Sequence, residues 1–295
     1  MTNFPEIGVA APNRENGRML AATNPLFQWG LKTFGAWRFD VSGDAELVPL
    51  SFRLNEKHLA RFATPEALDA RLDQIDAIRP IERVFVMGCG RSGTWLLTGL
   101  MSTFEDVCVV AKETPVEMFG QLTSTGQTLI LKRNLVAFKR FNDIPARIKI
   151  AYIIRHPFDV LTSHHPATKR RVYHIIPTRW VGEMQALRLA LESGREHLCV
   201  VRYEDLVTDC AGAEKKLSDE LGLKSKMPVQ DFTTAFNPSK RASRAMHGVR
   251  RIDTHSLHKY KSDPERIAYL KTIKPQLGET LDWVASRFGY DTSLR

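Results

Sequence analysis

A glycine-rich stretch, GCGRSGTW at residues 88–95, contains the residue types that bind anions. It follows a short apolar run and precedes a helical pattern, so backbone N–H groups at the start of the helix are expected to point at a ligand. Glycines let the backbone turn tightly and approach that ligand, and the hydroxyl groups donate hydrogen bonds to it. The residues with these properties are Gly88, Gly90, Ser92, Gly93 and Thr94, with Arg91 as the cation.

This stretch differs from the phosphate loop of nucleoside triphosphatases at one position. That loop carries a lysine between its last glycine and the Ser or Thr, whereas Gly93 is followed directly by Thr94 here. A phosphoryl-transferring kinase would need this lysine and an acidic magnesium ligand. A kinase is therefore the least favoured of the functions considered.

A second candidate anion site lies in the sequence IKIAYIIRHPFDVLTSHH, which begins at Ile148. An apolar strand is predicted to end at Arg155, Pro157 to open a helix, and Ser163 to follow two turns along that helix. Eight residues separate Arg155 from Ser163. We expect these two side chains to converge on one further phosphate.

Short apolar runs alternate with helical patterns over most of the chain, which indicates an α/β fold with a parallel central sheet flanked by helices. Such a sheet binds ligands at the carboxyl ends of its strands, where the glycine-rich stretch is expected to lie. Thr64 and Pro65 predict the start of a helix before the first of these strands. The predicted strands are residues 84–87, 107–111, 128–131, 148–154 and 197–201.

Two later segments give further structural expectations. The basic stretch at 237–251 has five cations and no acids, which predicts an exposed loop. The helical pattern at 264–290 is expected to be interrupted by Pro275.

The two anion-binding elements together resemble the sulfotransferases that use 3'-phosphoadenosine 5'-phosphosulfate (PAPS). The resemblance implies a P-loop-like sulfotransferase domain over residues 81–295, with residues 1–80 as an N-terminal extension or lid that packs on it. It also implies that Arg155 and Ser163 bind the 3'-phosphate. The residues that it assigns to the 5'-phosphosulfate end are Gly90, Arg91, Ser92, Gly93, Thr94 and Trp95.

Two further segments are similar to parts of the same family. In VVRYEDLVTD, Tyr203 corresponds to a tyrosine that helps to hold the adenine. VRRIDTHSLHKY resembles the basic loop that closes over the 3'-phosphate, which assigns Arg250 and Arg251 to this role. The loop lacks the usual glycines, and Tyr260 stands where a tryptophan is usual.

The general base separates branches of the family. The cytosolic aryl and steroid enzymes use a histidine, and Asn134 stands in its place in LKRNL. Carbohydrate-type enzymes use a glutamate that follows the loop after a helix and a strand, which predicts Glu113 as the base. Arg91 in the loop also fits this branch. Lys132 is either an ordinary strand-end lysine or reaches the transferring group, and we expect the second.

The bulk composition fits an anionic ligand. The formal charge is +9, and neither a secretory signal nor a stretch long enough to span a membrane is evident, so we expect a cytoplasmic protein. His156, His164 and His165 lack metal-ligand spacing, so we expect no metal. The basic stretch lacks interleaved aromatic residues, so we expect no nucleic-acid partner.

The predicted function is transfer of the sulfuryl group from PAPS to a hydroxyl of an acceptor, with adenosine 3',5'-bisphosphate as the product. The acceptor is expected to be a small molecule, a lipid or a glycan, and no motif identifies it or the oligomeric state. The alternative is a noncatalytic module that binds adenosine bisphosphate or a polyanion at the same sites.

Overall fold

The structure, a computed structural model, describes residues 41–50, 60–134, 137–165, 168, 172–238, 240–246 and 248–294. All of them belong to one compact unit. Most of the expected N-terminal extension, residues 1–40 and 51–59, lies outside the described residues. The boundary near residue 80 therefore stays a prediction, although residues 41–43 already form a strand of the main sheet.

The described part of the chain is built around a six-stranded sheet with the strand order β1-β4-β6-β3-β7-β8. Strand β1 is antiparallel to β4, and the other neighbouring strands are parallel. The prediction of an α/β fold with a mostly parallel sheet is confirmed. The strands are β1 (Val41–Gly43), β3 (Glu82–Gly88), β4 (Val107–Thr114), β6 (Thr128–Arg133), β7 (Lys149–Ile154) and β8 (Leu198–Arg202).

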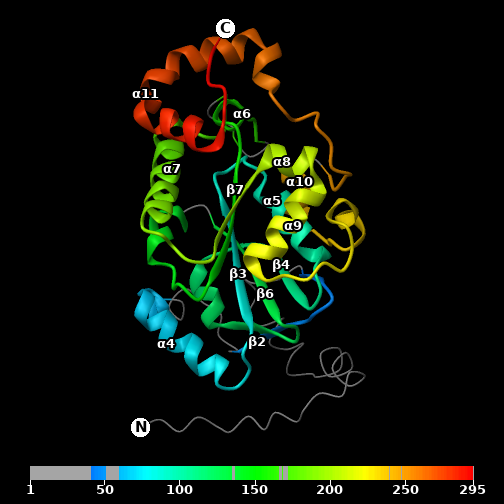
Figure 1. Cartoon of the computed structure of the whole chain (residues 1–295). Helices are drawn as coiled ribbons and strands as arrows, with labels where there is room; N and C mark the ends of the chain where they lie inside the picture. The colour runs from blue at the N-terminus through cyan, green and yellow to red at the C-terminus, as the bar shows by residue number, and fades with distance from the viewer. Residues whose placement is uncertain are drawn as a thin grey trace. The chain divides into compact units, whose positions relative to one another are not determined.

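Helices cover both faces of this sheet. Figure 1 shows α7 on one side of β3 and β7, and α5, α8 and α9 on the other. The described α-helices are α4 (Pro65–Asp76), α5 (Thr94–Leu100), α6 (Pro157–Leu161), α7 (Pro177–Glu192), α8 (Tyr203–Thr208), α9 (Cys210–Leu221), α10 (Lys240–Ala245) and α11 (Pro264–Phe288). The shorter elements are β2 (Leu47–Pro49), β5 (Leu122–Ser124), η1 (Ala60–Phe62), η2 (Met101–Thr103), η3 (Val116–Gly120), η4 (Ala137–Asp143), η5 (Val229–Thr234) and η6 (Lys259–Ser262).

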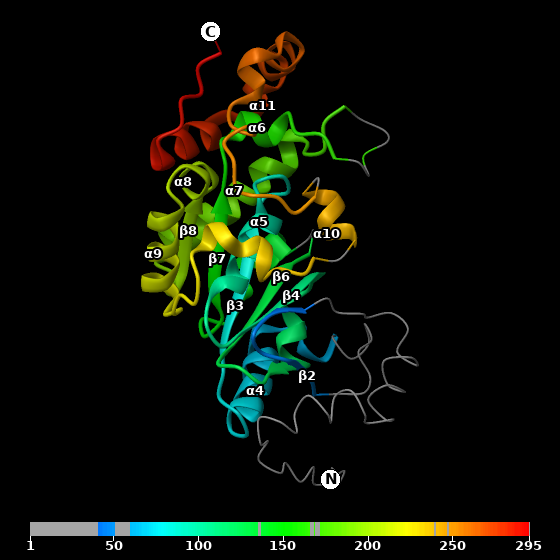
Figure 2. The same cartoon turned by 90° about the vertical axis from the view of Figure 1, so that its right-hand side faces the viewer.

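The chain reverses its direction of travel across the sheet at β3. From β3 it runs to β4 and β6 on one side, and then to β7 and β8 on the other. In open α/β sheets, ligands bind outside the carboxyl ends of the strands at such a switch point. The loop that follows β3 lies there, with the ends of β6 and β7 on its two sides (Figure 2).

The helix before β3 begins as predicted. Thr64 accepts a hydrogen bond from the Ala67 amide at 3.2 Å, and Pro65 occupies the first helical position. Leu68, Leu72 and Ile75 share the buried face. Local capping and periodicity were sufficient to predict this element.

Three expectations about local structure were wrong. The basic stretch 237–251 contains helix α10, whose Ala242 is fully buried, because packing on the core stabilises a helix that composition does not suggest. Helix α11 continues through Pro275, and its backbone departs from helical geometry at Gly278, where φ is 49°. Helix α6 ends at Leu161, so Ser163 lies beyond the helix and not on it.

Candidate functional site

The loop between β3 and α5 is folded by its own hydrogen bonds. The Ser92 amide and hydroxyl both donate to the Cys89 carbonyl, at 3.1 and 2.6 Å. Ser92 is 1% exposed, so in this structure its hydroxyl stabilises the turn. The turn places Arg91 in the left-handed region at φ 70°, which is uncommon for a residue other than glycine.

Position 93 requires a glycine for two reasons, its backbone conformation and the closeness of its neighbours. Its φ is 101°, which side chains rarely allow. A Cβ atom at this position would lie 2.6 Å from Cδ2 of Tyr203. The absence of a side chain therefore lets the Tyr203 ring rest directly on the loop.

Two arginines from different strand ends meet beside this ring. Arg155 follows β7 and is 9% exposed. Its guanidinium lies 4.4 Å from the Tyr203 ring centroid, and its Nη1 donates to the Arg91 carbonyl at 3.3 Å. Burial, and then the nearby charge of Arg155, lowers the pKa of Arg91. Both effects disfavour the charged form of Arg91, and a bound anion would offset them.

Eight of the predicted site residues line one hollow at this edge of the sheet. Its other walls are largely apolar, with Phe232 and Met246 among them. The predicted residues that line it are Arg91, Gly93, Thr94, Trp95, Arg155, Tyr203, Arg250 and Arg251. The structure therefore brings the loop after β3, the end of β7 and the segment after α10 together.

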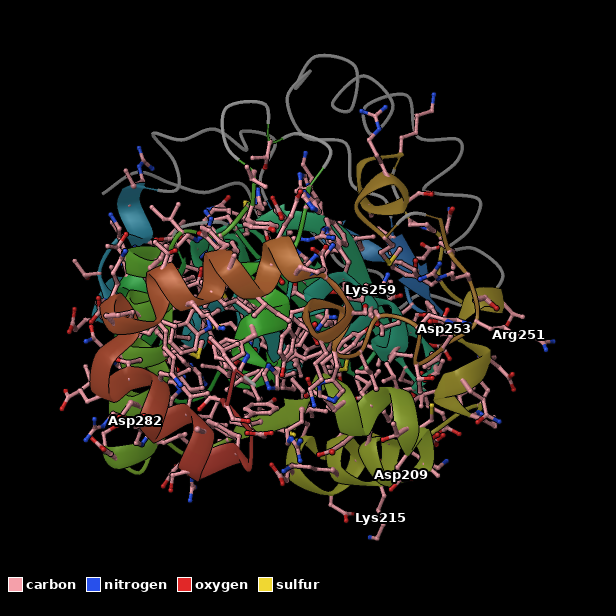
Figure 3. The ribbon with its side chains drawn as sticks, turned by 90° about the horizontal axis from the view of Figure 1, so that it is seen from above. Asp209, Lys215, Arg251, Asp253, Lys259 and Asp282 are labelled. Carbon is pink, nitrogen blue, oxygen red and sulfur yellow. The ribbon has the colours of Figure 1, made fainter. Side chains whose placement is uncertain are left out.

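The segment after α10 forms the outer wall of this hollow. Arg250 and Arg251 are exposed, and Arg250 pairs with Asp253 at 3.3 Å. Figure 3 looks down on this edge of the sheet and shows Arg251 and Asp253 along the segment. The two arginines therefore reach the hollow from its solvent side.

Ser256 connects the same segment to Arg155 and Tyr203, which are two of the predicted nucleotide-binding residues. Its carbonyl accepts a hydrogen bond from Arg155, and its hydroxyl bonds to the Tyr203 hydroxyl. Arg155 also lies 3.6 Å from the buried carboxylate of Asp159. The sequence patterns did not identify Ser256, because its contacts join residues about 50 and 100 positions apart.

Ser163 takes a different place from the one expected. Its hydroxyl donates to the Asp159 carbonyl at 2.7 Å, and it is not among the residues that line the hollow. Gly90 is also not among the residues that line the hollow. A Cβ atom built on Gly90 would point toward Ile175 and Arg179. The assignment of both residues to the donor site stays a prediction.

Glu113 and Lys132 form the polar pair on the other side of the loop. Glu113 Oε1 lies 3.0 Å from Lys132 Nζ. Lys132 is 2% exposed, and its ammonium lies 4.1 Å from the centroid of the Trp95 ring. Since Trp95 is the second residue of α5, the pair lies close to the end of the loop at which this helix begins.

A buried carboxylate links the ends of β7 and β8. Glu204 accepts hydrogen bonds from the His156 amide and from the Tyr290 hydroxyl, each at 2.9 Å. His156 directly follows Arg155, and Glu204 directly follows Tyr203. The carboxylate therefore fixes the positions of Arg155 and Tyr203 relative to each other. The pattern YED was a visible signal for Glu204, although nothing in the sequence indicated Tyr290 as its partner.

Among the described residues, no group of three or more His, Cys, Asp or Glu side chains is placed to hold a metal ion. The four cysteines form no disulfide, and Cys89, Cys108 and Cys199 are buried. No helix of the described ranges combines the length and apolarity needed to cross a bilayer.

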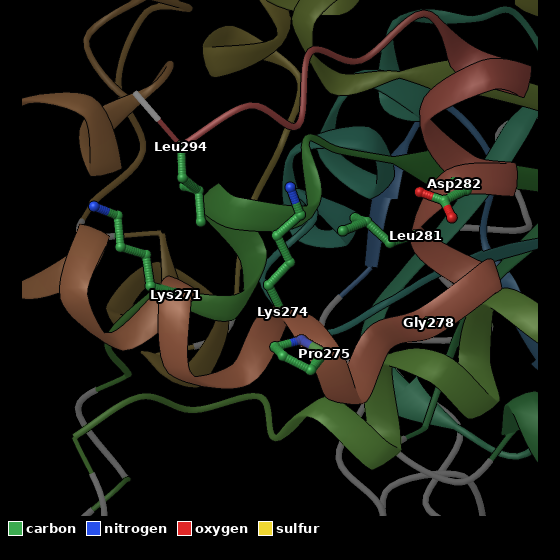
Figure 4. A pocket seen from close by; sticks show the side chains of 7 residues that line it. All are labelled: Lys271, Lys274, Pro275, Gly278, Leu281, Asp282 and Leu294. Carbon is green, nitrogen blue, oxygen red and sulfur yellow. The ribbon is translucent and has the colours of Figure 1, made fainter.

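A second hollow lies on α11 near its departure from helical geometry (Figure 4). It is an open groove of ≈ 520 Å³ lined mainly by Lys271, Lys274, Leu281 and Asp282. Lys274 is occupied by a hydrogen bond to the Thr292 carbonyl at 3.0 Å. None of the predicted site residues lies in this groove.

Comparison with solved structures shows the same fold in sulfotransferase domains. The sulfotransferase domain from the curacin biosynthetic pathway aligns with 73% of this chain and 100% of its own, at 16% identity and a TM-score of 0.50. The sulfotransferase domain from the Synechococcus PCC 7002 olefin synthase aligns with 72% and 96%, at 15% identity and a TM-score of 0.55. No family profile and no curated protein sequence matches the chain. At these identities the likeness shows the fold.

Proposed function

We propose that this protein is a sulfotransferase that moves the sulfuryl group of PAPS to a hydroxyl of an acceptor. One observation carries the proposal: arginines from separate strand ends and loops line the same hollow as Tyr203. The hollow lies at the switch point of a sheet whose fold is found in sulfotransferase domains.

The residues of the hollow fit a nucleotide with phosphate groups at two positions. Arg91 and the loop amides provide donors for one phosphate, and Arg155 and Arg250, which come from other segments of the wall, provide donors for a second. Charge-assisted hydrogen bonds from arginine to phosphate are among the strong ones. Tyr203 and the apolar residues of the lining provide a surface for a purine base.

Entry of the nucleotide requires the outer wall to move. The hollow has a volume of ≈ 170 Å³, below the ~300–1,000 Å³ usual for ligand pockets. Ser256 occupies donors of Arg155 and Tyr203 that a nucleotide would use. We therefore expect the segment 248–256 to release these contacts when the donor binds.

Different residues of the chain have different roles in the proposed reaction. PAPS supplies the sulfuryl group, which passes in line between two oxygens, so positioning and charge stabilisation supply most of the catalysis. Arg91 and the loop amides stabilise charge on the departing 5'-phosphate. Glu113 takes the proton of the acceptor hydroxyl, and Lys132, which pairs with it at 3.0 Å, orients its carboxylate.

A small molecule is the favoured acceptor. The two similar structures belong by name to the curacin biosynthetic pathway and to an olefin synthase. Lipids and carbohydrates remain in the acceptor class because the chemistry needs only a positioned hydroxyl.

Sulfur-labelled PAPS tests the proposal directly. The purified protein is incubated with the donor and panels of phenols, hydroxylated natural products, lipids and glycans, and labelled products are separated. Transfer above a boiled-protein control supports the proposal. Tight binding of adenosine 3',5'-bisphosphate without transfer to any acceptor would instead identify a noncatalytic binding module.

A further inference from the structure

We infer that Arg179, near the start of α7, is a positioning residue that fixes the phosphate loop at Gly90. The inference rests on the proposed function, because it assigns Arg179 to the 5' end of the donor site. The loop motif alone did not indicate a role for Arg179, since 89 positions separate it from Gly90.

Gly90 is the point at which α7 and its preceding segment meet the loop. A Cβ atom on Gly90 would lie 2.8 Å from Ile175 Cδ1 and 3.6 Å from Arg179 Nη2. The backbone of Gly90 has no positive φ, so glycine is needed here for space. The close approach makes the loop position depend on the two side chains that cover it.

A buried carboxylate orients the arginine. Arg179 Nε donates to Glu183 Oε1 at 2.9 Å, and Glu183 is 1% exposed. The second oxygen of Glu183 accepts from Arg133 Nη2 at 3.4 Å, at the carboxyl end of β6. The cluster of two arginines and one glutamate therefore carries one surplus positive charge beside the loop.

One of the two other guanidinium nitrogens of Arg179, Nη2, explains why this cluster acts on the loop. Nη2 is enclosed by protein atoms and has no hydrogen-bond partner among the residues that the structure describes. A buried cationic donor without a partner is costly, and native proteins retain few of them. This nitrogen is also the Arg179 atom that lies nearest to the Cβ position of Gly90. The positive charge of Arg179 thus lies next to the loop, where it adds to the attraction of the loop amides for the 5'-phosphate.

Arg155 and Arg179 act on different parts of the donor site. Arg155 contacts the loop at Arg91 and lines the hollow, whereas Arg179 lies beside Gly90, 3.6 Å from where a Cβ atom of this residue would stand, and is not among the lining residues. Loss of Arg179 is therefore expected to weaken recognition of the 5'-phosphate and to leave recognition of the 3'-phosphate intact.

The substitution Arg179→Lys isolates this role. A lysine at this position retains the charge and the pairing with Glu183, four residues along the helix, but has no second nitrogen to place on Gly90. Calorimetry measures the Kd of adenosine 3',5'-bisphosphate, adenosine 3'-monophosphate and 5'-AMP. We expect the preference for the bisphosphate over the 3'-monophosphate to fall about tenfold or more, because the lysine withdraws one charged donor from the loop. The preference for the bisphosphate over 5'-AMP should stay unchanged.

Arg188→Lys is the matched control. Arg188 pairs with Glu192 at 2.7 Å on the same helix with the same spacing, and both side chains are exposed. The control should leave both preferences unchanged. Thermal unfolding without ligand establishes that each variant is folded, and Arg179→Gln replaces Arg179→Lys if the lysine variant is not.

The outcomes separate this inference from the proposed function. If the wild type binds none of the three nucleotides, the proposed function fails and the inference fails with it. If the wild type prefers the bisphosphate and Arg179→Lys keeps the full preference, the inference alone is overturned. A proportional loss of affinity for all three nucleotides, or an equal loss in Arg188→Lys, would also overturn it.

Discussion

Glu113 and Lys132 lie opposite each other, 3.0 Å apart, because β4 is irregular. Val110 pairs with Leu131, but the next pair along β6 is Glu113 with Lys132, so β4 contains two extra residues at this point. Bulges re-aim side chains near functional sites. Here the irregularity brings a carboxylate that is partly exposed against an ammonium that is buried.

We predict that Glu113→Gln lowers kcat by about 10²–10⁴, the usual contribution of a positioned base. The amide preserves the shape of the side chain and removes its basicity. Binding of adenosine 3',5'-bisphosphate should stay nearly unchanged, since the substitution does not alter the hollow. Rates with saturating labelled donor and calorimetry measure the two quantities.

Glu82→Gln is the control for this prediction. Glu82 pairs with Lys149 at 3.0 Å across β3 and β7, at the opposite edge of the same sheet. It should leave kcat unchanged. Full turnover in Glu113→Gln, together with inactivity of Lys132→Ala or of a His164 or His165 variant, would place the base elsewhere.

Arg155→Ala should remove the preference for adenosine 3',5'-bisphosphate over 5'-AMP. The guanidinium is held by the Arg91 carbonyl and the Tyr203 ring, which aims it at the expected 3'-phosphate. Titration of both nucleotides measures the ratio of affinities. Arg147→Ala, just before the opposite end of β7, is the control, and a preserved ratio in Arg155→Ala would refute the assignment.

Gly93→Ala should abolish nucleotide binding. The new methyl group would lie 2.6 Å from the Tyr203 ring and also force a side chain into φ 101°. Gly194→Ala separates these effects, because Gly194 has φ 67° with open space around it. We expect both variants to lose stability in urea unfolding and Gly93→Ala alone to lose binding. Normal binding by Gly93→Ala would show that the ring is not part of the site.

Stability should fall in mild acid because of His156. Burial lowers its pKa from 6.5 to about 4, although the Asp291 carbonyl and Asp159 act in the opposite direction. Since the folded pKa lies below the unfolded one, the unfolded chain binds more protons between these values. The free energy of unfolding is then greatest above pH 6.5 and falls by about 3 kcal/mol on going to pH 4.

His156→Asn tests this cause. Asparagine can still accept the Phe158 amide hydrogen bond at the start of α6, but it does not titrate. Urea unfolding at several pH values should show a flatter dependence for the variant. An identical slope in both proteins would assign the acid sensitivity to other groups.

Turnover should survive an excess of chelator, because the proposed site uses cationic side chains and loop amides to neutralise the donor. Assays with and without EDTA on protein freed of metal by dialysis measure this. Loss of activity that one divalent ion restores would show that a metal contributes.

Much of the fold follows from local sequence signals. Short, mostly unbroken apolar runs predicted the positions of β3, β4, β6, β7 and β8, because strands covered on both faces are rich in apolar residues. The glycine pattern predicted the loop after β3 for a similar reason, since the tight turn at Gly93 excludes side chains. These signals depend on the backbone and on burial, which a few neighbouring residues determine.

The contacts that complete the candidate site depended on the tertiary structure. Strand register placed Glu113 opposite Lys132, and packing of α7 brought Arg179 to Gly90. The prediction of an exposed loop from composition was wrong at α10, because this basic segment forms a helix whose Ala242 is buried in the core. The sequence by itself thus determined which residue types follow each strand, through local propensity and burial. Which of them meet was decided by long-range register and packing, which no local pattern encodes.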